Sequence, residues 1–359
     1  MRVSARRRPT LDDVADAVGV SRATVSNAYN RPDQLSAELR REVLRAAERL
    51  GYTGPNPIAR SLATRRTGAI AFMLDTGLSA AFSDPALSIT LDALAATVDS
   101  EGLALLLLPG GDDGGPRADR ILTAQADLAV AYSLADGAPA LRAVRRRGLP
   151  LVVIDQPVVP GSARVGIDDR GGAAAAARHL LELGHRRFAI LSAQCLSAPR
   201  GGPLTAAEAA RSRFLDNRQR LSGYLDTIEA AGLDPAAVPI WETSGLSRNE
   251  AMTGARGLLD REPRPTALLC MSDELALSAL AAARQLGLAV PDEVSIVGFD
   301  DTPPAIWADP PLTTVRQDLV RKGRLAGELA LKLLAGERVP EPATLDVELV
   351  VRGSSGPAK

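Results

Sequence analysis

The chain has 359 residues and a mass of 37.6 kDa, which is too long for one ordinary domain and suggests two or three. Apolar residues make up 46% and aromatic residues only 3%, so large cores are possible but must be built from aliphatic side chains. The formal net charge of −1 alone argues against a nucleic-acid partner. However, residues 1–66 hold 13 arginines and 7 acidic residues, a net charge of +6, whereas residues 67–359 carry a net charge of −7. A basic segment on an acidic body suggests a small polyanion-binding module attached to something else.

Other bulk features exclude further classes. The two cysteines, Cys195 and Cys270, are too few for a disulfide framework or a zinc site and fit a reducing cytoplasm. No apolar run of signal-peptide length follows the arginine-rich start, and no segment approaches the roughly 18 apolar residues of a membrane span. We therefore expect a cytoplasmic protein with no membrane partner, no cofactor and no metal.

The first 51 residues carry the pattern of three short helices. Thr10 opens the first helix with a capping-box spacing, and Gly19 ends it. Ser21 can cap a second helix, and a third extends from Ser36 to Gly51. Three short helices with a glycine turn between the first two predict a helix-turn-helix arrangement.

The second of these helices has an outward face suited to reading DNA. Val25 faces inward, which leaves Arg22, Ala23 and Asn27 outward. Arg can make a bidentate contact to guanine, Asn to adenine, and the Ala methyl can touch a thymine methyl. Thr24 and the helix N-terminus suit phosphates. By spacing alone, a small helical cap with a solvated face remains an alternative.

A linker and then a repeating α/β pattern follow. Residues 54–57 are typical of a linker, and residues 58–64 form a weak helix-like run that is too short to be stable alone. Beyond Gly68, continuous apolar strands alternate with helices, which predicts parallel sheets covered on both faces and hence two doubly wound lobes with a crevice between them. The expected strands are Ala69–Leu74, Leu103–Leu108, Leu128–Ala131, Leu151–Ile154, Phe188–Leu191, Ala236–Ile240, Ala267–Met271, Val294–Phe299 and Leu345–Val351.

No catalytic constellation is evident. His179 and His185 are expected to pack or to cap a helix, and the adjacent acidic pairs 168–169 and 300–301 project differently and have no third ligand nearby in sequence. The glycine-rich stretch 110–115 lacks the Gly-Lys-Ser/Thr ending of a phosphate loop. We expect it, and residues 196–210, to be loops.

Short motifs stand along nearly the whole length of the chain. In the head these are residues 10–27 and Leu50-Gly51-Tyr52, followed by Asn56 and Leu62-Ala63. In the body the motifs are Val-Gly-Ile-Asp-Asp (165–169), Leu-Gly-His-Arg-Arg (183–187), Met-Ser-Asp (271–273), Gly-Phe-Asp-Asp (298–301) and Pro-Leu-Thr-Thr-Val-Arg-Gln (311–317). With these motifs in family order, the chain resembles the LacI/GalR family of bacterial repressors.

For the head, this resemblance implies DNA contacts. Arg22 and Ala23 match the two family positions that choose operator bases, and Asn27 matches a third that is often Arg, so its base preference stays open. Residues 56–64 match the hinge helix that orders only on operator DNA, and Leu62 matches the leucine that wedges into the minor groove, although a buried linker residue is the alternative. The full set of expected DNA-binding residues, including phosphate-facing or capping positions, is Thr10, Ser21, Arg22, Ala23, Thr24, Ser26, Asn27, Asn30, Asn56, Leu62 and Ala63.

For the body, the resemblance implies a periplasmic-binding-protein-like core with a small ligand between its lobes. Asp155 and Asp300 match ligand-contacting aspartates, and Arg220 matches a central arginine that could offer its fork of donors to hydroxyls or a carboxylate. The ordinary alternatives are that strand-end acids cap helices and that Arg220 forms a surface ion pair. The expected effector-binding residues are Phe82, Asp84, Asp155, Arg220, Ser272, Asp300, Trp307 and Gln317, with the two aromatic residues as possible walls.

Together these features predict a ligand-responsive transcriptional repressor that is not an enzyme. Residues 1–54 would form the DNA-binding domain, residues 55–66 the hinge, and residues 67–359 the effector-binding and dimerisation core. A homodimer would bind a near-palindromic operator, and the C-terminal residues 353–359 lack the leucine heptads of the family's tetramers. A transporter's solute-binding protein would need a signal peptide and would have no use for the head, and an enzyme would need a nucleophile, base or cofactor motif.

The expected effector is a small molecule, a sugar or a related metabolite, and its identity stays open at this point. Sugars, sugar phosphates and purines all suit such a crevice, and the low aromatic content slightly weakens the case for a stacked sugar. The sequence also leaves open whether the effector is an inducer or a corepressor, and which operator and genes are involved.

Overall fold

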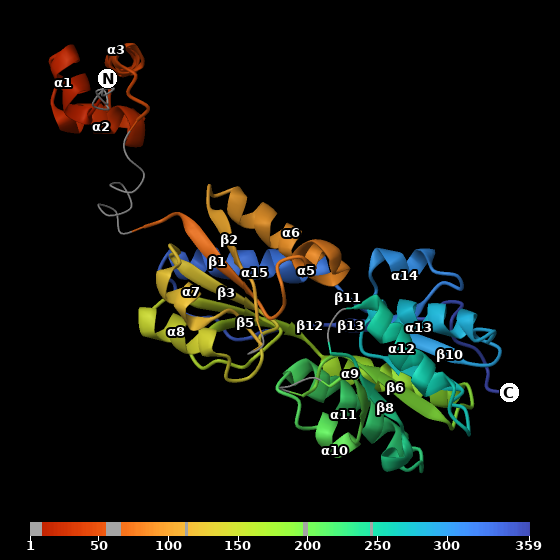
Figure 1. The fold of residues 1–359 in the computed structure, drawn as a ribbon. Helices are drawn as coiled ribbons and strands as arrows, with labels where there is room; N and C mark the ends of the chain where they lie inside the picture. Colours follow the sequence, from red (N-terminus) through yellow and green to blue (C-terminus); the bar gives the residue numbers. More distant parts are fainter. Residues whose placement is uncertain (1–8, 55–65, 112–113, 197–199, 245–246) are drawn as a thin grey trace, which may run out of the picture. The chain divides into compact units, whose positions relative to one another are not determined.

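Figure 1 shows the computed structural model, which describes residues 9–54, 66–111, 114–196, 200–244 and 247–359. The chain divides into two compact units, Met1–Thr67 and Gly68–Lys359. We call them the head unit and the core unit. Among the described residues, no helix combines the length and the apolar composition needed to cross a bilayer.

The described part of the head unit is a helix-turn-helix followed by a third helix. Its helices are α1 (Leu11–Val18), α2 (Arg22–Asn30) and α3 (Ala37–Leu50), with the short 3-10 helix η1 (Pro32–Gln34) before α3. The expected capping box opens α1, since Thr10 Oγ1 accepts from Asp13 N–H at 3.3 Å and Asp13 accepts from Thr10 N–H at 2.7 Å. Gly19 ends α1 with a φ of 71°, a left-handed conformation that glycine adopts without strain.

A small aliphatic core joins the three helices of the head. Val14, Val25 and Val43, one from each helix, have no exposed surface. Tyr29 and Tyr52 pack edge to face against each other, with ring centroids 6.0 Å apart. Because Val25 is buried in this core, the opposite side of α2 is left facing outward.

The first lobe of the core unit is built on a six-stranded parallel sheet with the order β12-β5-β4-β3-β1-β2. Successive residues of one strand face opposite sides, so Ile70 and Phe72 pack in the cluster that contains Leu94, whereas Ala71 and Met73 pack in the cluster that contains Ile121. The strands are β1 (Ala69–Leu74), β2 (Ala104–Leu108), β3 (Leu128–Tyr132), β4 (Leu151–Ile154), β5 (Ala163–Ile167) and β12 (Ala343–Leu345).

Helices cover both faces of this sheet. The helix α15 packs against α6 and against β3, β4 and β5, and α7 packs against α8 (Figure 1). The helices of this lobe are α5 (Ala80–Ser83), α6 (Pro85–Asp99), α7 (Ala118–Thr123), α8 (Pro139–Arg147) and α15 (Leu319–Leu334).

The second lobe is built on a seven-stranded sheet with the order β13-β11-β10-β9-β6-β8-β7, in which only the edge strands β13 and β7 pair antiparallel. Its strands are β6 (Phe188–Ser192), β7 (Gly202–Leu204), β8 (Ile240–Glu242), β9 (Ala267–Cys270), β10 (Ser295–Asp300), β11 (Thr313–Gln317) and β13 (Val347–Val350). Its helices are α9 (Asp169–Glu182), α10 (Ala206–Ala209), α11 (Leu215–Ala230), η2 (Pro235–Ala237), α12 (Arg248–Leu259), α13 (Asp273–Gln285) and α14 (Pro303–Trp307).

The chain passes between the two sheets at three points in the described core. Asp168 follows β5 and caps α9, Asp318 follows β11 and caps α15, and Asp346 separates β12 from β13. The last expected strand, Leu345–Val351, is therefore divided between the two lobes.

Three expectations about local structure are corrected. Residues 236–240 were expected to be a strand, but Asp234 accepts from Ala236 N–H at 2.9 Å and caps η2, and strand β8 begins only after Pro239. The region 196–210 contains β7 and α10, because Thr205 forms a capping box with Glu208. The strands β5 and β11 were not expected, since each is interrupted by polar residues or glycine.

Candidate functional site

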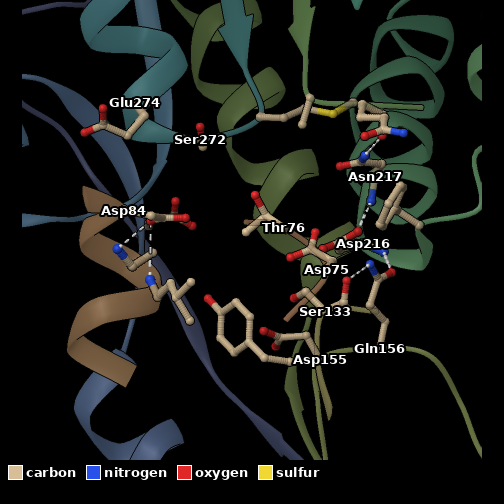
Figure 2. Close-up of a pocket in the computed structure, with 18 of the residues that line it drawn as sticks. Asp75, Thr76, Asp84, Ser133, Asp155, Gln156, Asp216, Asn217, Ser272 and Glu274 are labelled. Atoms are coloured by element: carbon tan, nitrogen blue, oxygen red, sulfur yellow. Dashed lines mark hydrogen bonds between the residues drawn. The ribbon is translucent and has the colours of Figure 1, made fainter. Parts of the chain in front are cut away.

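A cavity of about 270 Å³ lies at the carboxyl ends of strands from both sheets of the core unit. This is the edge at which open α/β sheets bind ligands. From the first lobe, Asp75 and Thr76 follow β1, Ser133 follows β3, and Asp155 and Gln156 follow β4 (Figure 2).

The second lobe supplies the opposite wall. One helix, α11, brings Asp216, Asn217 and Arg220 to the cavity, because positions three and four apart share a helical face. Asp300 ends β10 and Gln317 ends β11, and both side chains line the cavity.

Arg220 is held in place by ionic, polar and aromatic contacts. Its Nε donates to Asp169 Oδ1 at 2.8 Å, its Nη1 donates to the carbonyl oxygen of Met271, and Nη1 lies 3.8 Å from Asp300 Oδ1. Its guanidinium carbon lies 3.7 Å from the centroid of the Phe299 ring, a cation–π contact. Arg220 does form an ion pair, but with its side chain 12% exposed it belongs to the cavity wall and not to the outer surface.

Lys322 on α15 was not singled out by the sequence, yet it connects two of the expected residues. Its Nζ donates to both carboxylate oxygens of Asp155, at 2.8 and 2.9 Å, and to Gln317 Oε1. Gln317 Nε2 then donates to Asp300 Oδ1 at 2.6 Å. A continuous polar chain thus joins Asp155 of the first lobe to Asp300 of the second.

Burial changes the acidity of several of these carboxyl groups. Desolvation, with a further contribution from nearby Asp216, raises the pKa of Asp75 from 3.8 to about 7. Desolvation and the neighbouring Asp169 raise the pKa of Asp216 to about 6. Burial also raises the pKa of Asp300 well above its ordinary value, although Arg220 acts in the opposite direction. Perturbed carboxyl groups that share one cavity are typical of functional sites.

The backbone is strained at the same place. Four described residues other than glycine have positive φ, namely Ser133 at 48°, Asp155 at 63°, Asp300 at 120° and Asp301 at 57°. The first three line the cavity, and Asp301 follows Asp300. Such conformations cost on the order of 1–3 kcal/mol each and concentrate where function requires a particular side-chain direction.

Six of the eight expected effector-binding residues line the cavity, and two do not. Asp84, Asp155, Arg220, Ser272, Asp300 and Gln317 are brought together there. Asp84 and Ser272 also cap α6 and α13, so for these two residues capping and lining are combined.

The two expected aromatic walls are corrected. Phe82 is 74% exposed and lines a separate surface hollow with Val320, and Trp307, at the end of α14, is 83% exposed. The aromatic side chains at the cavity are instead those of Tyr132 and Phe214. The orientation of a side chain in such a short helix depends on the tertiary structure around it, which the sequence pattern does not specify.

Several residues that line the cavity were not expected from the sequence. Asp75 follows an apolar strand directly, so the rule that ligands bind at the carboxyl ends of strands could have found it. Asp216 and Asn217 lie one helical turn before Arg220 and could have been found from that spacing. Glu274, Gln156 and Gln194 gave no comparable signal.

In the head unit, the outward face of α2 displays the expected base-contacting residues. Arg22 and Ala23 are exposed, and among the described residues the one ion pair of Arg22 is a solvent-exposed contact of 3.8 Å with Asp12. Ser21 caps the helix by accepting from Thr24 N–H at 3.1 Å, and its hydroxyl lies 2.8 Å from that of Thr24.

The other polar residues of this helix are paired within the head. Asn30 Nδ2 donates to Ser26 Oγ at 3.2 Å, and Asn27 Nδ2 donates to Gln34 Oε1 at 3.3 Å. Thr10 is engaged in its capping box. The expected hinge contacts Asn56, Leu62 and Ala63 lie outside the described residues.

The remaining titratable groups that the sequence singled out have structural roles. His185 Nε2 lies 3.0 Å from the carbonyl oxygen of Gly356, and His179 Nε2 lies 2.9 Å from Ser355 Oγ, so both contact the C-terminal segment. Asp301 forms ion pairs with Arg316 and Arg352. Within the described ranges, no group of three or more His, Cys, Asp or Glu side chains is placed to hold a metal ion.

Two family models match the chain, one within the head unit and one within the core unit. Residues 10–56 match the bacterial regulatory proteins of the lacI family, and residues 177–355 match the periplasmic binding protein-like domain. An HTH-type transcriptional regulator of Mycobacterium tuberculosis is 42% identical over 358 residues, which is 98% of this chain and 98% of that protein.

Two solved structures extend the comparison. A lac repressor dimer bound to operator and the anti-inducer ONPF is 25% identical with a TM-score of 0.78, covering 98% of this chain and 100% of that one. A complex of the transcriptional regulator CelR with cellobiose is 29% identical with a TM-score of 0.69, covering 97% of this chain and 100% of that one.

A helix-turn-helix head followed by a two-lobed, periplasmic-binding-protein-like core defines a class of DNA-binding transcriptional regulators. The chain belongs to the LacI family of bacterial transcriptional regulators.

Proposed function

We propose that this regulator is a repressor that binds a near-palindromic operator as a homodimer and is controlled by a small effector in the cavity. The observation that carries the proposal is the exposed face of α2, which offers Arg22 and Ala23 to a major groove. The separate, polar cavity of the core unit supports control by a ligand. The lac repressor structure, a dimer on operator, supports the same arrangement here.

We further propose that residues 1–54 bind DNA, residues 55–66 form the hinge, and residues 67–359 form the effector core. Two copies of Leu62 would enter the minor groove at the operator centre and kink it. The protein would act in the bacterial cytoplasm, at the nucleoid when bound. We propose no catalytic role, since its relatives carry the names of regulators.

Control would operate through a population shift between two arrangements of the lobes. An effector held by Asp155 of one lobe and Asp300 of the other would favour the arrangement in which both contacts are made. Coupling requires that the effector bind the two arrangements with different affinities, and the reciprocal effect of operator on effector binding must then be equal in size.

The test is a titration of the full chain with DNA from the region upstream of its own gene, at two salt concentrations, beside a scrambled fragment of equal length. A steep salt dependence with a strong preference for one site is expected. Equal affinity for both fragments would reject the proposal. Deleting the gene should raise transcription from the bound promoter, whereas a fall would show an activator.

A further inference from the structure

Helix α8 presents a cluster of cations on the outer surface of the first lobe. Ala140 and Ala143 are buried on the inner side of this helix. Arg142, Arg145 and Arg146 lie on the opposite side and are exposed, and their spacing of three and four residues places them on one helical face. We call these three residues the arginine face of α8.

The arginine face is not neutralised within the described part of the chain. None of its guanidinium groups forms an ion pair with a described carboxylate, and Arg142 Nη1 donates to the Gly137 carbonyl at 2.9 Å. Arg147, which ends the same run, is used differently. Its Nη1 donates to the carbonyl oxygens of Ile121 and Ala124, at 2.8 and 2.6 Å, where α7 ends. Arg147 therefore has a structural role, whereas the arginine face has none of this kind.

A hollow of about 620 Å³ lies beside the arginine face. All three of its arginines line the hollow, together with Ala118 of α7 and Pro139 of α8. The two helices pack against each other at this place (Figure 1). A carboxylate that enters the hollow would be close to more than one guanidinium group, and guanidinium groups bind carboxylates through paired hydrogen bonds.

An apolar groove of about 540 Å³ follows the other flank of α8. Arg142 and Arg145 line it too, and they therefore stand between the hollow and the groove. The groove is also lined by apolar side chains that are not fully buried, namely Leu141, Leu149, Pro150, Val159 and Pro160. Val158, beside Val159, is 66% exposed. Apolar surface of this kind, next to polar groups, is typical of interaction sites.

The two parts of this surface together indicate the chemistry of a partner. A bare polyanion would satisfy the arginine face but would leave the apolar groove in water. A protein segment with carboxylates beside apolar side chains satisfies both, in the way that amphipathic helices dock in grooves. The arginine face also belongs to a part of the chain, residues 67–359, with a net charge of −7, so a local positive charge would direct an acidic partner to this surface.

We propose that the arginine face of α8 and the adjoining apolar groove dock an acidic, amphipathic segment of a partner protein. The proposal does not depend on DNA binding or on effector control, because none of the residues that line the hollow or the groove lines the cavity.

The test is fluorescence anisotropy of a labelled synthetic peptide titrated with the full chain. The peptide has about 18 residues, with leucines at helical spacing and glutamates between them. One comparison peptide has serine in place of every leucine, and another has glutamine in place of every glutamate. We expect the acidic, leucine-containing peptide to bind at least about tenfold more tightly than either comparison peptide, and more weakly as salt is added.

Variants assign this binding to the arginine face. Arg142→Gln/Arg145→Gln/Arg146→Gln should weaken the peptide at least about tenfold. The matched control replaces three exposed arginines of the second lobe with glutamine, removes the same charge and should leave the affinity unchanged; these are Arg178, Arg256 and Arg261. Arginines in the last turn of α8 also interact favourably with its C-terminal end, so thermal unfolding of both variants checks that they are folded. If the first variant does not fold, the three peptides compared on the unaltered chain still decide the question.

Other occupants give other results. Equal binding of the serine peptide, or displacement of the leucine peptide by inorganic polyphosphate at equal concentration of charge, would show a general polyanion surface and overturn the proposal. A smaller mass by light scattering for the variant of the arginine face than for the control variant would show that a second copy of this chain covers α8. Absence of peptide binding, or an equal loss in the control variant, would also reject the proposal.

Discussion

Lys322 illustrates how a single residue can organise this site without lining it. Its side chain lies on α15, is 1% exposed, and donates to both oxygens of Asp155. A lysine can be buried in this way only if its charge is paired and its donors are used. Lys322 is therefore a positioning residue, which fixes the direction of Asp155 and, through Gln317, of Asp300.

We expect Lys322→Met to lower the free energy of unfolding of the protein by roughly 3–5 kcal/mol, because Asp155 keeps a buried charge without its cation. The double variant Lys322→Met/Asp155→Asn should recover much of this loss, and Lys332→Met, on the exposed side of the same helix, should change little. Urea unfolding followed by circular dichroism measures all three. A double variant no more stable than the single one would contradict the pairing.

Asp75 should make stability depend on pH. Its pKa in the folded state, about 7, lies above the ordinary 3.8, so the folded protein holds a proton there that the unfolded chain releases. The free energy of unfolding should therefore fall as the pH rises from about 4 to about 7 and level off above that. Asp75→Asn should reduce this slope and be more stabilising at pH 8 than at pH 5. Urea unfolding at several pH values measures the free energy of unfolding of the wild-type protein and of Asp75→Asn. If this free energy varied with pH in the same way in both proteins, Asp75 would not be the source of the pH dependence.

Arg22 is exposed on α2, and we propose that it reads an operator base. Arg22→Ala should relax the preference at one operator position by about 1–3 kcal/mol, because a bidentate contact to guanine would be lost. Arg45→Ala, an exposed arginine on α3, is the control and should retain the base preference. Competition binding with operators changed one base pair at a time distinguishes them, and a uniform loss for all sequences would make Arg22 a phosphate contact.

At the scale of elements, the C-terminal segment is part of the second lobe's structure. Ser354 is fully buried, its N–H donates to the Pro311 carbonyl, and its hydroxyl accepts from Thr313 N–H at 2.8 Å and donates to the Ile296 carbonyl at 2.6 Å. The sequence of this segment, rich in glycine and serine, gave no sign of such a role. Both histidines also contact it.

Removing residues 353–359 should therefore lower the free energy of unfolding by roughly 2–4 kcal/mol, since each of several buried hydrogen bonds contributes about 1 kcal/mol. Removing only residues 357–359 should cost much less, because Lys359 contributes an exposed ion pair with Asp292. Thermal unfolding of the two truncated proteins makes the comparison. Equal stability would show that Ser354 is not needed.

The elements differ in how far their sequences determine them. Helix α1 follows from its capping box and glycine stop, and β1 and β4 have the predicted bounds, because continuous apolar strands buried on both faces have a clear signature. The strand expected at residues 236–240 is wrong, because a local cap and a proline act against the apolar run. The strands β5 and β11 could not be predicted, since pairing with neighbours far along the chain stabilises them.

At the scale of the whole molecule, the charge separates into two parts, with +6 in residues 1–66 and −7 in the remainder. A homodimer would bring the basic segments of both copies to one operator, which favours DNA binding at low salt. Light scattering at micromolar concentration should give the mass of a dimer, about twice 37.6 kDa. A stable tetramer would contradict this prediction.

The sequence by itself determined the class of protein, the three helices of the head, the alternation of strands and helices in the core, and six residues of the cavity wall. The helices and the alternation depend on local patterns, whereas the class and the six wall residues were implied by the chain's resemblance to the LacI/GalR family. Only the tertiary structure decided that Lys322 and Ser354 are buried, that Phe82 and Trp307 are exposed and do not line the cavity, and that six carboxyl groups line it together. These facts depend on how helices and loops pack across two lobes, which no local pattern encodes.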